Sequence, residues 1–502
     1  MTVHLSVVIF FPLVFALVVA LLPPRIAPAA MVGSLVPLIY AVIMLLDFET
    51  GRPGLQYVTN DTWIEDLGIR YILGVDGLNL WLVALTALLF AVAGLWVALR
   101  PPATRPRLYC FHLALAETAV LGAFLAQDLI LFVLFFDLML VPFYFLVGQW
   151  GSGPDRVAAT FKLVIYTLVG SLLMLAAAVA TGVLAGAGPD GSVSFSIAQL
   201  SQASLDEGTQ KWLFAAFALA FLIKMPAFPF HGWMPDAYRS MPLPVLAVFS
   251  GVLSKVAAYG FLRVVLPILP DAVQAFDVVV LLIALVSILY GSILAFTQTN
   301  SRLILGYSSM AQLGFITLGI FALGEAAGAQ GSLLQMLNHG LVVAPLFFIV
   351  GLLAERANGS EDLRDMGGIA FRAPVMATLF LIVSLATLAM PGSANFVGEF
   401  LILLGVFNAK LAIALIASIG VALASVYMLR MYIRSMHNRG GEHVRSFEIS
   451  LRDGLVLVPL VLAILAFALY PQQALKDSEP TVTRIVAGAS GNTPVAQEGV
   501  AP

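Results

Sequence analysis

The feature that most constrains the fold is the recurrence of long apolar runs. Runs of roughly 18 or more apolar residues follow one another over almost the whole chain, which is typical of helices that cross a bilayer. Of the 502 residues, 61% are hydrophobic and only 11% are charged. Soluble domains carry about 25% charged residues. The sequence therefore predicts an all-α integral membrane protein.

The apolar runs divide into about fourteen spans. We expect them near residues 4–22, 30–46, 78–99, 109–126, 129–148, 157–186, 211–230, 243–266, 277–297, 303–324, 330–353, 373–408 (interrupted), 411–433 and 453–470. The first run lacks a basic leader and a small-residue cleavage site, so we expect a retained helix. In the polar loop 47–76, WIEDLGIRYIL predicts a short interfacial segment. The tail 471–502 is rich in Pro, Gly, Ser and Thr, and is expected to be flexible.

Basic residues alternate between the loops. The odd-numbered loops hold Arg25, Arg100, Arg105, Arg107, Arg156, Arg239, Arg302, Arg356, Arg364, Arg372, Arg434, Arg439, Arg445 and Arg452, whereas the even-numbered loops hold only Arg52, Arg70, Lys211 and Lys410. Loops rich in Lys and Arg stay in the cytoplasm. Both termini are therefore expected outside, which agrees with an even number of spans.

Seven charged residues away from the loops form the predicted intramembrane set: Glu117, Asp137, Lys162, Lys224, Lys255, Arg263 and Glu399. Each costs roughly 2.5–3.5 kcal/mol on insertion scales, so such groups usually pair, face water or carry ions. Lys162 and Arg263 lie near helix ends, from which their side chains can reach the interface. Glu117 fits equally well a hydrogen-bonded neutral acid. The other four lie deeper, and a purely structural role for all of them is the less favoured interpretation.

Two spans are interrupted beside these charges. In FLIKMPAFPFHGWMPD, Pro226 and Pro229 follow Lys224 at once, and in MPGSANFVGEF, Pro391 and Gly392 come shortly before the intramembrane glutamate. Proline removes a helical hydrogen bond, and in a membrane such a break persists only where other helices or water meet the freed groups. The alternative is that these residues merely kink two helices.

The two broken spans hold equivalent positions. If helices four to eight form one unit and helices nine to thirteen another, each broken span is fourth in its unit, and the units begin on opposite sides. This is the pattern of inverted repeats in transporters. The sequence then divides into an N-terminal three-helix segment with an outside loop (1–108), a first repeat (109–266), a second repeat (277–434), a cytoplasmic loop with the last helix (435–470) and the tail (471–502).

The deep charges permit proton transfer. Burial favours the neutral form of a lysine, and a nearby carboxylate favours its charged form. Lys224 beside Asp137 would therefore hold a proton while the carboxylate is close and release it otherwise. Lys255 and Glu399 would continue the path through bound water.

Histidine suits a proton relay near neutral pH, and His231 and His339 are candidates for that role. His339 fits a packing role almost as well, and His231 is expected at the cytoplasmic mouth. The chain has no GxxxxGK[ST] phosphate loop and one cysteine, Cys110, so it has neither a nucleotide site of that kind nor a cysteine-ligated cluster. An ion gradient or partner subunits must supply the energy.

Several motifs together resemble the antiporter-like subunits of respiratory complex I, the NADH:quinone oxidoreductase. The motifs are GVDGLNLWLVALTALL (74–89), FFDLMLVPFYFLVGQWG (135–151), RVAATFKLVIYTLVGSLLML (156–175), IKMPAFPFHGWMPDAY (223–238), SGVLSKVAAYGFLR (250–263), SRLILGYSSMAQLGFITLGIF (301–321), LNHGLV (337–342) and NFVGEFLIL (395–403). Length, the N-terminal pattern and an acid in the twelfth helix resemble the M-type, proton-channel chains. Mrp-type antiporters and membrane-bound hydrogenases share the motifs.

The resemblance implies fourteen helices in two inverted five-helix units around a central axis of charged residues and water. It implies that Asp137 pairs with Lys224 and that Lys255 links to Glu399. It further implies that redox chemistry sits in other subunits of a prokaryotic inner-membrane complex, and that this chain holds no cofactor and no metal. Secondary relay candidates are His339, His231, Glu117, Gln312 and Lys162.

Two residues depart from the family pattern. The acid of the fifth helix is usually glutamate, and the shorter Asp137 is expected to lie farther from Lys224. SSMAQLG places Gln312 where histidine is common, and an amide does not take a proton at neutral pH. The alternatives are a cation/proton antiporter, a membrane-hydrogenase subunit, a structural subunit that no longer pumps, and, least favoured, a solute carrier. Sodium-dependent activity favours the first, and pumping after Lys224→Ala favours the structural subunit.

Overall fold

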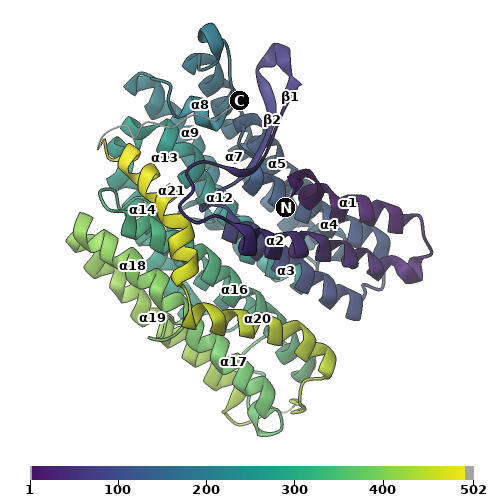
Figure 1. The fold of residues 1–502 in the computed structure, drawn as a ribbon. Coiled ribbons are helices and arrows are strands. Elements are labelled where there is room, and N and C mark those ends of the chain that lie inside the picture. Colours follow the sequence, from purple (N-terminus) through teal and green to yellow (C-terminus); the bar gives the residue numbers. More distant parts are fainter. Residues whose placement is uncertain (1–2, 442, 492–502) are drawn as a thin grey trace.

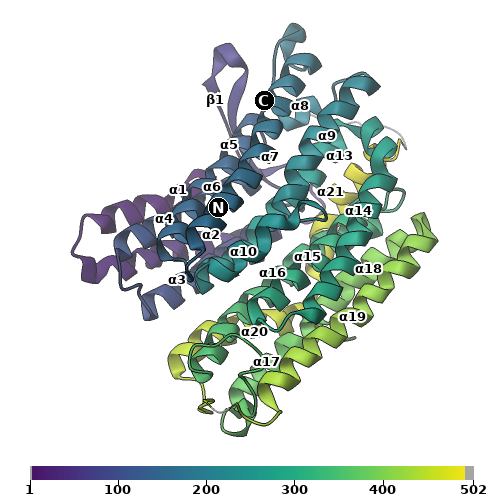
Figure 2. The same cartoon turned by 180° about the vertical axis from the view of Figure 1, so that it is seen from behind.

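A computed structural model describes residues 3–441 and 443–491 of the chain (Figures 1 and 2). The N-terminal part contains α1 (Leu5–Ala20), the 3₁₀ helix η1 (Pro24–Ser34), α2 (Leu35–Asp47), β1 (Gln56–Ile64), η2 (Glu65–Leu67), β2 (Ile69–Val75) and α3 (Leu80–Leu99). The helices α1, α2, α3 and α4 pack together with η1 into one layer at the edge of the molecule.

The middle of the chain corresponds to the predicted first repeat. It contains α4 (Pro106–Leu125), α5 (Leu129–Leu138), α6 (Leu140–Trp150), α7 (Arg156–Ala185), η3 (Pro189–Gly191), α8 (Ile197–Leu200), α9 (Glu207–Lys224), η4 (Phe230–Trp233), α10 (Met234–Ser240), α11 (Leu243–Val248), η5 (Phe249–Leu253), α12 (Ser254–Gly260), η6 (Phe261–Val265) and α13 (Leu266–Ile268). Both η5 and η6 are π-helical, so the eighth span carries two π segments around α12.

The last part contains the predicted second repeat and the C-terminal elements. These are α14 (Pro270–Thr297), α15 (Ser301–Ile320), α16 (Ala326–Arg356), η7 (Ile369–Phe371), α17 (Pro374–Thr387), α18 (Ala394–Ala409), α19 (Leu411–Met436), α20 (Leu451–Leu469) and α21 (Gln472–Ala489). The twelfth span is interrupted between α17 and α18, as predicted. Gly392 adopts φ +90° in this break, a conformation that a residue with a side chain rarely takes.

Within the described residues, eleven helices are long and apolar enough to cross a membrane, and α1, α17 and α18 are shorter apolar helices. The protein is therefore an integral membrane protein of mostly helical fold. The count of fourteen spans and the inverted relation of the repeats stay predictions. An 18-residue apolar stretch in each of the spans 243–268, α15 and α16 is entirely buried inside the chain, whereas fewer than half of the residues in the corresponding stretches of α7 and α19 are buried. The core of the molecule thus lies around α12, α15 and α16.

The polar loop 47–76, in which a short interfacial segment is predicted, contains a β-hairpin. Strands β1 and β2 pair antiparallel, and Gly68 turns between them with φ +69°. The hairpin projects from the helical body at the end that also holds α8 (Figure 1). We refer to this end of the bundle as the hairpin side.

The predicted flexible tail is wrong for residues 472–489, which form α21, whereas residues 492–502 lie outside the described part. Helix α21 crosses the bundle and packs on α13, α14 and α16 (Figure 1). Its buried Asp477 accepts hydrogen bonds from Thr50 Oγ1 at 2.5 Å and Trp81 Nε1 at 3.1 Å. Polar contacts to the N-terminal part therefore fix a segment whose composition alone favours disorder.

Candidate functional site

Protein groups take up the backbone carbonyls that the break after α9 frees. Pro226 has no N–H for the Leu222 carbonyl, and the N–H of Ala227 donates to that oxygen at 3.0 Å instead. The indole N–H of Trp233 donates to the Ile223 carbonyl at 2.9 Å. The chain can thus end a helix in the middle of the bundle without exposing its carbonyls to lipid.

Lys224 is the last residue of α9 and is 4% exposed. Its Nζ donates to the Phe136 carbonyl at 3.3 Å and lies 4.3 Å from the centre of the Phe136 ring. The charge of Asp137 reaches it, but no described carboxylate lies within salt-bridge distance, 4.0 Å, of Nζ. The two residues predicted to pair are therefore neighbours without a direct ion pair.

Asp137 lies where the fifth span bends. Pro142 has no N–H for the Leu138 carbonyl, so the span divides into α5 and α6 at this point. The Asp137 carboxyl interacts with the Ser171 hydroxyl of α7. Its Oδ1 is buried and has no hydrogen-bond partner in the described part of the chain. A third interrupted helix, which the sequence analysis did not single out, therefore adjoins the candidate path.

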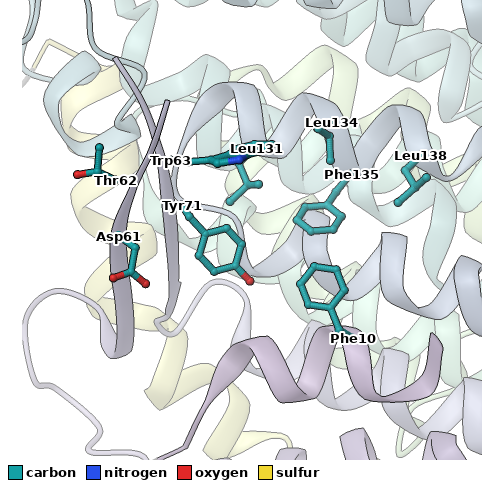
Figure 3. Close-up of a pocket in the computed structure, with 9 residues that line it drawn as sticks. All are labelled: Phe10, Asp61, Thr62, Trp63, Tyr71, Leu131, Leu134, Phe135 and Leu138. Carbon is teal, nitrogen blue, oxygen red and sulfur yellow. The ribbon is translucent and has the colours of Figure 1, made fainter. Parts of the chain in front are cut away.

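A groove of about 510 Å³ opens beside α5, between the hairpin and α1 (Figure 3). Its lining residues are Phe10, Asp61, Thr62, Trp63, Tyr71, Leu131, Leu134, Phe135 and Leu138. None of them belongs to the predicted path, so this groove is separate from the candidate site.

Lys255 is fully buried on α12, between the two π segments. Its Nζ donates to the Ser250 carbonyl one turn earlier. The Ser250 hydroxyl in turn contacts the Ser309 hydroxyl of α15 at 3.1 Å. His339 of α16 is near enough to interact electrostatically with Lys255. The π segments on either side of Lys255 are of a kind that often marks functional sites.

Glu399 of α18 is buried and is held by two glutamines. Its Oε1 accepts from Gln312 Nε2 at 2.8 Å and from Gln335 Nε2 at 3.4 Å, and Gln335 Nε2 also donates to Gln312 Oε1 at 2.7 Å. The Oε2 atom has no partner among the described residues. Gln312 therefore orients the carboxylate at the position where histidine is common in the family.

Helices α16 and α18 meet closely beside this carboxylate. A Cβ atom on Gly398 would lie 2.5 Å from Gln335 Oε1, and one on Gly331 would lie 2.7 Å from the Ile402 nitrogen. Asn338 donates to the Ala394 carbonyl at 2.6 Å, at the start of α18. Small residues and one amide thus fix the break of the twelfth span against α16.

Many buried polar atoms around this break lack a partner within the described ranges. They are Glu399 Oε2, Gln335 Oε1, Asn338 Oδ1, His339 Nδ1, Ser384 Oγ, Ser393 Oγ, and both side-chain polar atoms of Asn395. Buried polar groups in proteins are almost always satisfied, by water where no protein group is close. This region is therefore the part of the bundle best suited to hold water.

The four deep residues lie on helices that contact one another in series. Lys224 contacts Phe136, the neighbour of Asp137 on α5, and α9 packs against α12. Helix α12 packs against α15, the preceding η5 against α16, and both α15 and α16 pack against α18. Asp137, Lys224, Lys255 and Glu399 thus lie on a row of helices that contact one another across the bundle.

The secondary candidates lie in different places. Glu117 is buried on α4, and its Oε2 accepts from Ser34 Oγ at 2.5 Å, which supports the interpretation as a hydrogen-bonded acid. Lys162 forms an ion pair of 2.8 Å with Asp236 on the exposed face of α7, as expected of a residue near a helix end. His231, in η4, is half-buried and its Nδ1 has no described partner.

The expectation that Arg263 reaches the interface is wrong. The residue is 8% exposed, and its guanidinium forms an ion pair of 2.6 Å with Asp76. Asp76 lies between β2 and α3 and is brought there by tertiary packing, so no local pattern in the sequence pairs the two residues.

Gln335 and Asn338 are site residues that the sequence analysis did not select. Both stand in LLQMLNHG with His339, and polar residues three and four apart on an apolar helix share a face. That spacing was the available signal. Among the described residues, no group of three His, Cys, Asp or Glu side chains is arranged to hold a metal ion.

Comparison with known proteins identifies the family of the chain. Residues 126–424 match the family described as NADH:quinone oxidoreductase/Mrp antiporter, TM. The chain is 34% identical to NADH-quinone oxidoreductase subunit M of Rhodobacter capsulatus, over 96% of each chain. It is 35% identical to the subunit M of Mycobacterium tuberculosis, over 95% of this chain and 93% of the relative.

Solved structures of three complexes contain a similar fold. A chain of respiratory complex I from Thermus thermophilus aligns with a TM-score of 0.88 and 28% identity, over 97% of this chain and 99% of that chain. A chain of the Mrp complex from Dietzia shares the fold with a TM-score of 0.83 and 22% identity, over 98% of this chain and 100% of that chain. A chain of an archaeal membrane-bound sulfane sulfur reductase also shares the fold, with a TM-score of 0.81 and 24% identity, over 93% of this chain and 76% of that chain. The chain belongs to the NADH:quinone oxidoreductase/Mrp antiporter transmembrane family.

Proposed function

We propose that this chain is the proton-translocating M subunit of the membrane arm of an NADH:quinone oxidoreductase. Its relatives at 34–35% identity over almost their full length are subunits M. The observation that carries the proposal is the series of buried Lys224, Lys255 and Glu399, with the half-buried Asp137, on helices in contact. Isolated charges at such depth are costly, so a connected series of four indicates transport.

The proton steps follow from the contacts of each group. Lys224 has a weak carbonyl contact and a carboxylate nearby without a direct ion pair, so a small approach or retreat of Asp137 changes how well it holds a proton. Lys255 is the next acceptor along the row. Because Gln312 offers an amide, the proton passes from Lys255 by way of His339 or water to Glu399.

Energy for this transfer comes from outside the chain. Moving one charge against 100 mV costs about 2.3 kcal/mol. We propose that partner subunits of the membrane complex supply that energy from electron transfer to quinone and that the chain itself holds no redox centre. We propose that the chain lies in a prokaryotic inner membrane, and the arginine-rich loops favour an orientation with both termini outside.

The test is proton pumping by the assembled complex in sealed vesicles, with electron transfer measured in parallel. Lys224→Ala is expected to lose pumping by about 10²-fold, as for removal of a positioned proton-transfer group. Lys211→Ala is the matched control, because Lys211 lies on the same helix in an exposed ion pair with Glu207. Pumping by the assembled Lys224→Ala complex at the wild-type rate would show that the row is not the path. Pumping that requires sodium ions would favour a cation/proton antiporter instead.

A further inference from the structure

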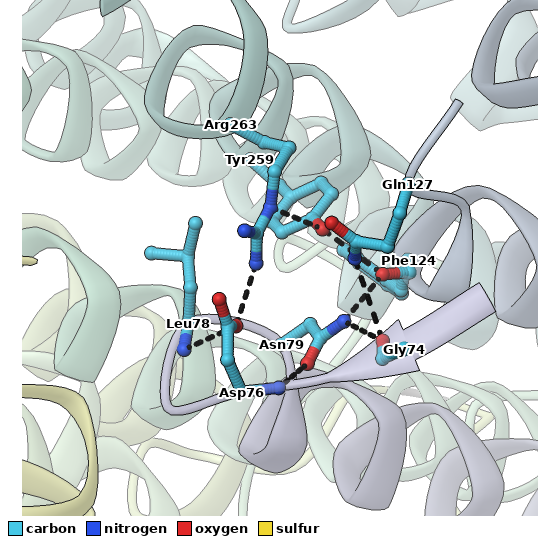
Figure 4. Close-up of polar contacts among 8 residues, drawn as sticks. All are labelled: Gly74, Asp76, Leu78, Asn79, Phe124, Gln127, Tyr259 and Arg263. Carbon is cyan, nitrogen blue, oxygen red and sulfur yellow. Dashed lines mark hydrogen bonds and ion pairs between the residues drawn. The ribbon is translucent and has the colours of Figure 1, made fainter. Parts of the chain in front are cut away.

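The motif GVDGLNL, which the proposed path does not use, contributes to a buried polar network on the hairpin side. The network, called here the Asp76–Arg263 network, consists of Gly74, Asp76, Leu78, Asn79, Phe124, Gln127, Tyr259 and Arg263 (Figure 4). Its members come from the end of β2, the start of α3, the end of α4, and α12 with η6. It therefore closes the point where the hairpin meets the bundle.

The network lies directly beyond Lys255 along one helix face. Lys255, Tyr259 and Arg263 are spaced four residues apart, so they follow one another on the same side of the eighth span. Eight residues correspond to roughly 12 Å along a helix. Any proton that left Lys255 toward the hairpin side would meet Tyr259 first and Arg263 next.

The Tyr259 hydroxyl cannot pass a proton onward. Its hydroxyl donates to the Phe124 carbonyl at 3.0 Å and accepts from Arg263 Nε at 2.9 Å. A hydroxyl that passes a proton on must give its own hydrogen to the next acceptor, and here that acceptor is a backbone carbonyl. The same carbonyl already accepts from Asn79 Nδ2 at 2.8 Å.

Arg263 and Asp76 are equally unsuited to relay. A guanidinium has no acceptor and stays charged. Asp76 Oδ1 accepts from Arg263 at 2.6 Å and from the Leu78 N–H at 3.0 Å. A proton on Asp76 would leave Arg263 as an unpaired buried charge, which is costly. In the described part of the chain, no fully buried side-chain nitrogen or oxygen of this network lacks a hydrogen-bond partner.

We propose that the Asp76–Arg263 network is a proton barrier that seals the hairpin side of Lys255. It limits proton transfer from Lys255 to the direction of His339 and Glu399. It thereby prevents protons from leaking from Lys255 to the hairpin side. Arginine acts as an electrostatic barrier to protons in other membrane pores. The inference rests on the proposed proton path through Lys255.

The experiment is passive proton conductance of vesicles that contain the assembled complex, under an imposed potassium diffusion potential and with electron transfer inhibited. The double variant Asp76→Asn/Arg263→Gln removes both charges and leaves neither unpaired. We expect a several-fold rise in conductance, and we expect that adding Lys255→Ala returns it to the wild-type level. Electron transfer in the presence of an uncoupler stays at the wild-type rate in the double variant, because redox chemistry lies elsewhere.

The matched control is Arg100→Gln/Asp453→Asn, which removes another Arg–Asp ion pair, of 2.5 Å, on a different pair of helices. It is expected to leave the passive proton conductance at the wild-type level. Wild-type conductance in Asp76→Asn/Arg263→Gln would overturn the barrier, and so would a leak that persists with Lys255→Ala, because that leak is general damage. If the double variant does not assemble, Tyr259→Phe decides. This variant removes only the hydroxyl, so we expect a smaller rise in proton conductance that again depends on Lys255. Wild-type conductance in this variant would overturn the barrier.

Failure of the barrier and failure of the proposed function give different results. If Lys224→Ala abolishes pumping and the Arg263 variants stay tight, only the barrier is wrong. If Lys224→Ala pumps normally, the proposed function is wrong whatever the leak.

Discussion

Two buried polar regions of this chain use hydrogen bonds in opposite ways. In the Asp76–Arg263 network, each fully buried side-chain polar atom has a partner among the described residues. Around the break of the twelfth span, Glu399 lies with Gln312, Gln335, Asn338 and Asn395, here called the Glu399 cluster, and several of these atoms have none. Both regions are buried, with Asp76 and Arg263 at 6% and 8% exposure and the members of the Glu399 cluster at 3% or less, so the unsatisfied atoms do not lie in the more exposed region.

The difference teaches how a membrane protein separates structure from transport. A saturated network holds its helices in one arrangement and offers no site for an additional proton. An unsaturated cluster favours water, and water connects ionisable groups that are too far apart for direct transfer. The comparison predicts that mutations in the first region change stability most, and that mutations in the second change pumping most.

The largest effect on stability is expected from Asp76→Ala. The substitution leaves Arg263 charged and unpaired in a buried site, and breaking such a pair costs about 3–5 kcal/mol. Unfolding of the detergent-solubilised subunit by heat or denaturant measures the loss. Asp76→Asn/Arg263→Gln is expected to lose less than Asp76→Ala, although it changes two residues. Equal or greater loss in the double variant would contradict the ion-pair explanation.

The parts of the fold that the sequence predicted depend on local signals. The twelfth break follows from Pro391 and Gly392, and the end of α9 follows from Pro226 and Pro229, because each acts within one helical turn. The depth of Lys224, Lys255 and Glu399 follows from their position in apolar runs. The comparisons confirm the family that these motifs indicated.

The parts that the sequence did not predict depend on contacts between distant segments. Asp76 and Arg263 are 187 residues apart, and only tertiary packing brings the segment between β2 and α3 to the eighth span. The tail became α21 because Asp477 bonds to Thr50 and Trp81 of the N-terminal part. Composition and Pro480 favour a loop there, and tertiary contacts override both.

The next largest effect on stability is expected from Asn79→Ala. Asn79 donates to the Gly74 and Phe124 carbonyls and accepts from the Asp76 N–H at 2.9 Å, and all three groups would remain buried. Leaving a buried group unsatisfied costs about 1–3 kcal/mol. The same unfolding measurement applies, with pumping by the assembled complex recorded beside it. A variant that keeps its stability but stops pumping would place Asn79 in the path and break the comparison.

Gln335→Leu is expected to lose only about 1 kcal/mol of stability, since it removes hydrogen bonds in a region where other atoms already lack them. Pumping should fall strongly, because Glu399 loses one of the two amides that orient it. Gln210→Leu is the matched control. Gln210 is a buried glutamine bonded to Asp271 away from the cluster, so a similar loss of stability with normal pumping is expected. Normal pumping by Gln335→Leu would remove Gln335 from the site.

The smallest effect on stability is expected from Asn395→Leu, which separates the two regions most sharply. Asn395 is fully buried, and neither polar atom of its side chain has a hydrogen-bond partner in the described residues. Replacing it with an apolar group therefore leaves no protein partner unsatisfied, and the free energy of unfolding should change by less than about 1 kcal/mol. Pumping should still slow, because an apolar side chain beside Glu399 displaces the water that this amide favours. Asn408→Leu, on the exposed end of the same helix, should change neither quantity. A large loss of stability in Asn395→Leu, or unchanged pumping, would show that the Glu399 cluster, like the Asp76–Arg263 network, does not depend on bound water.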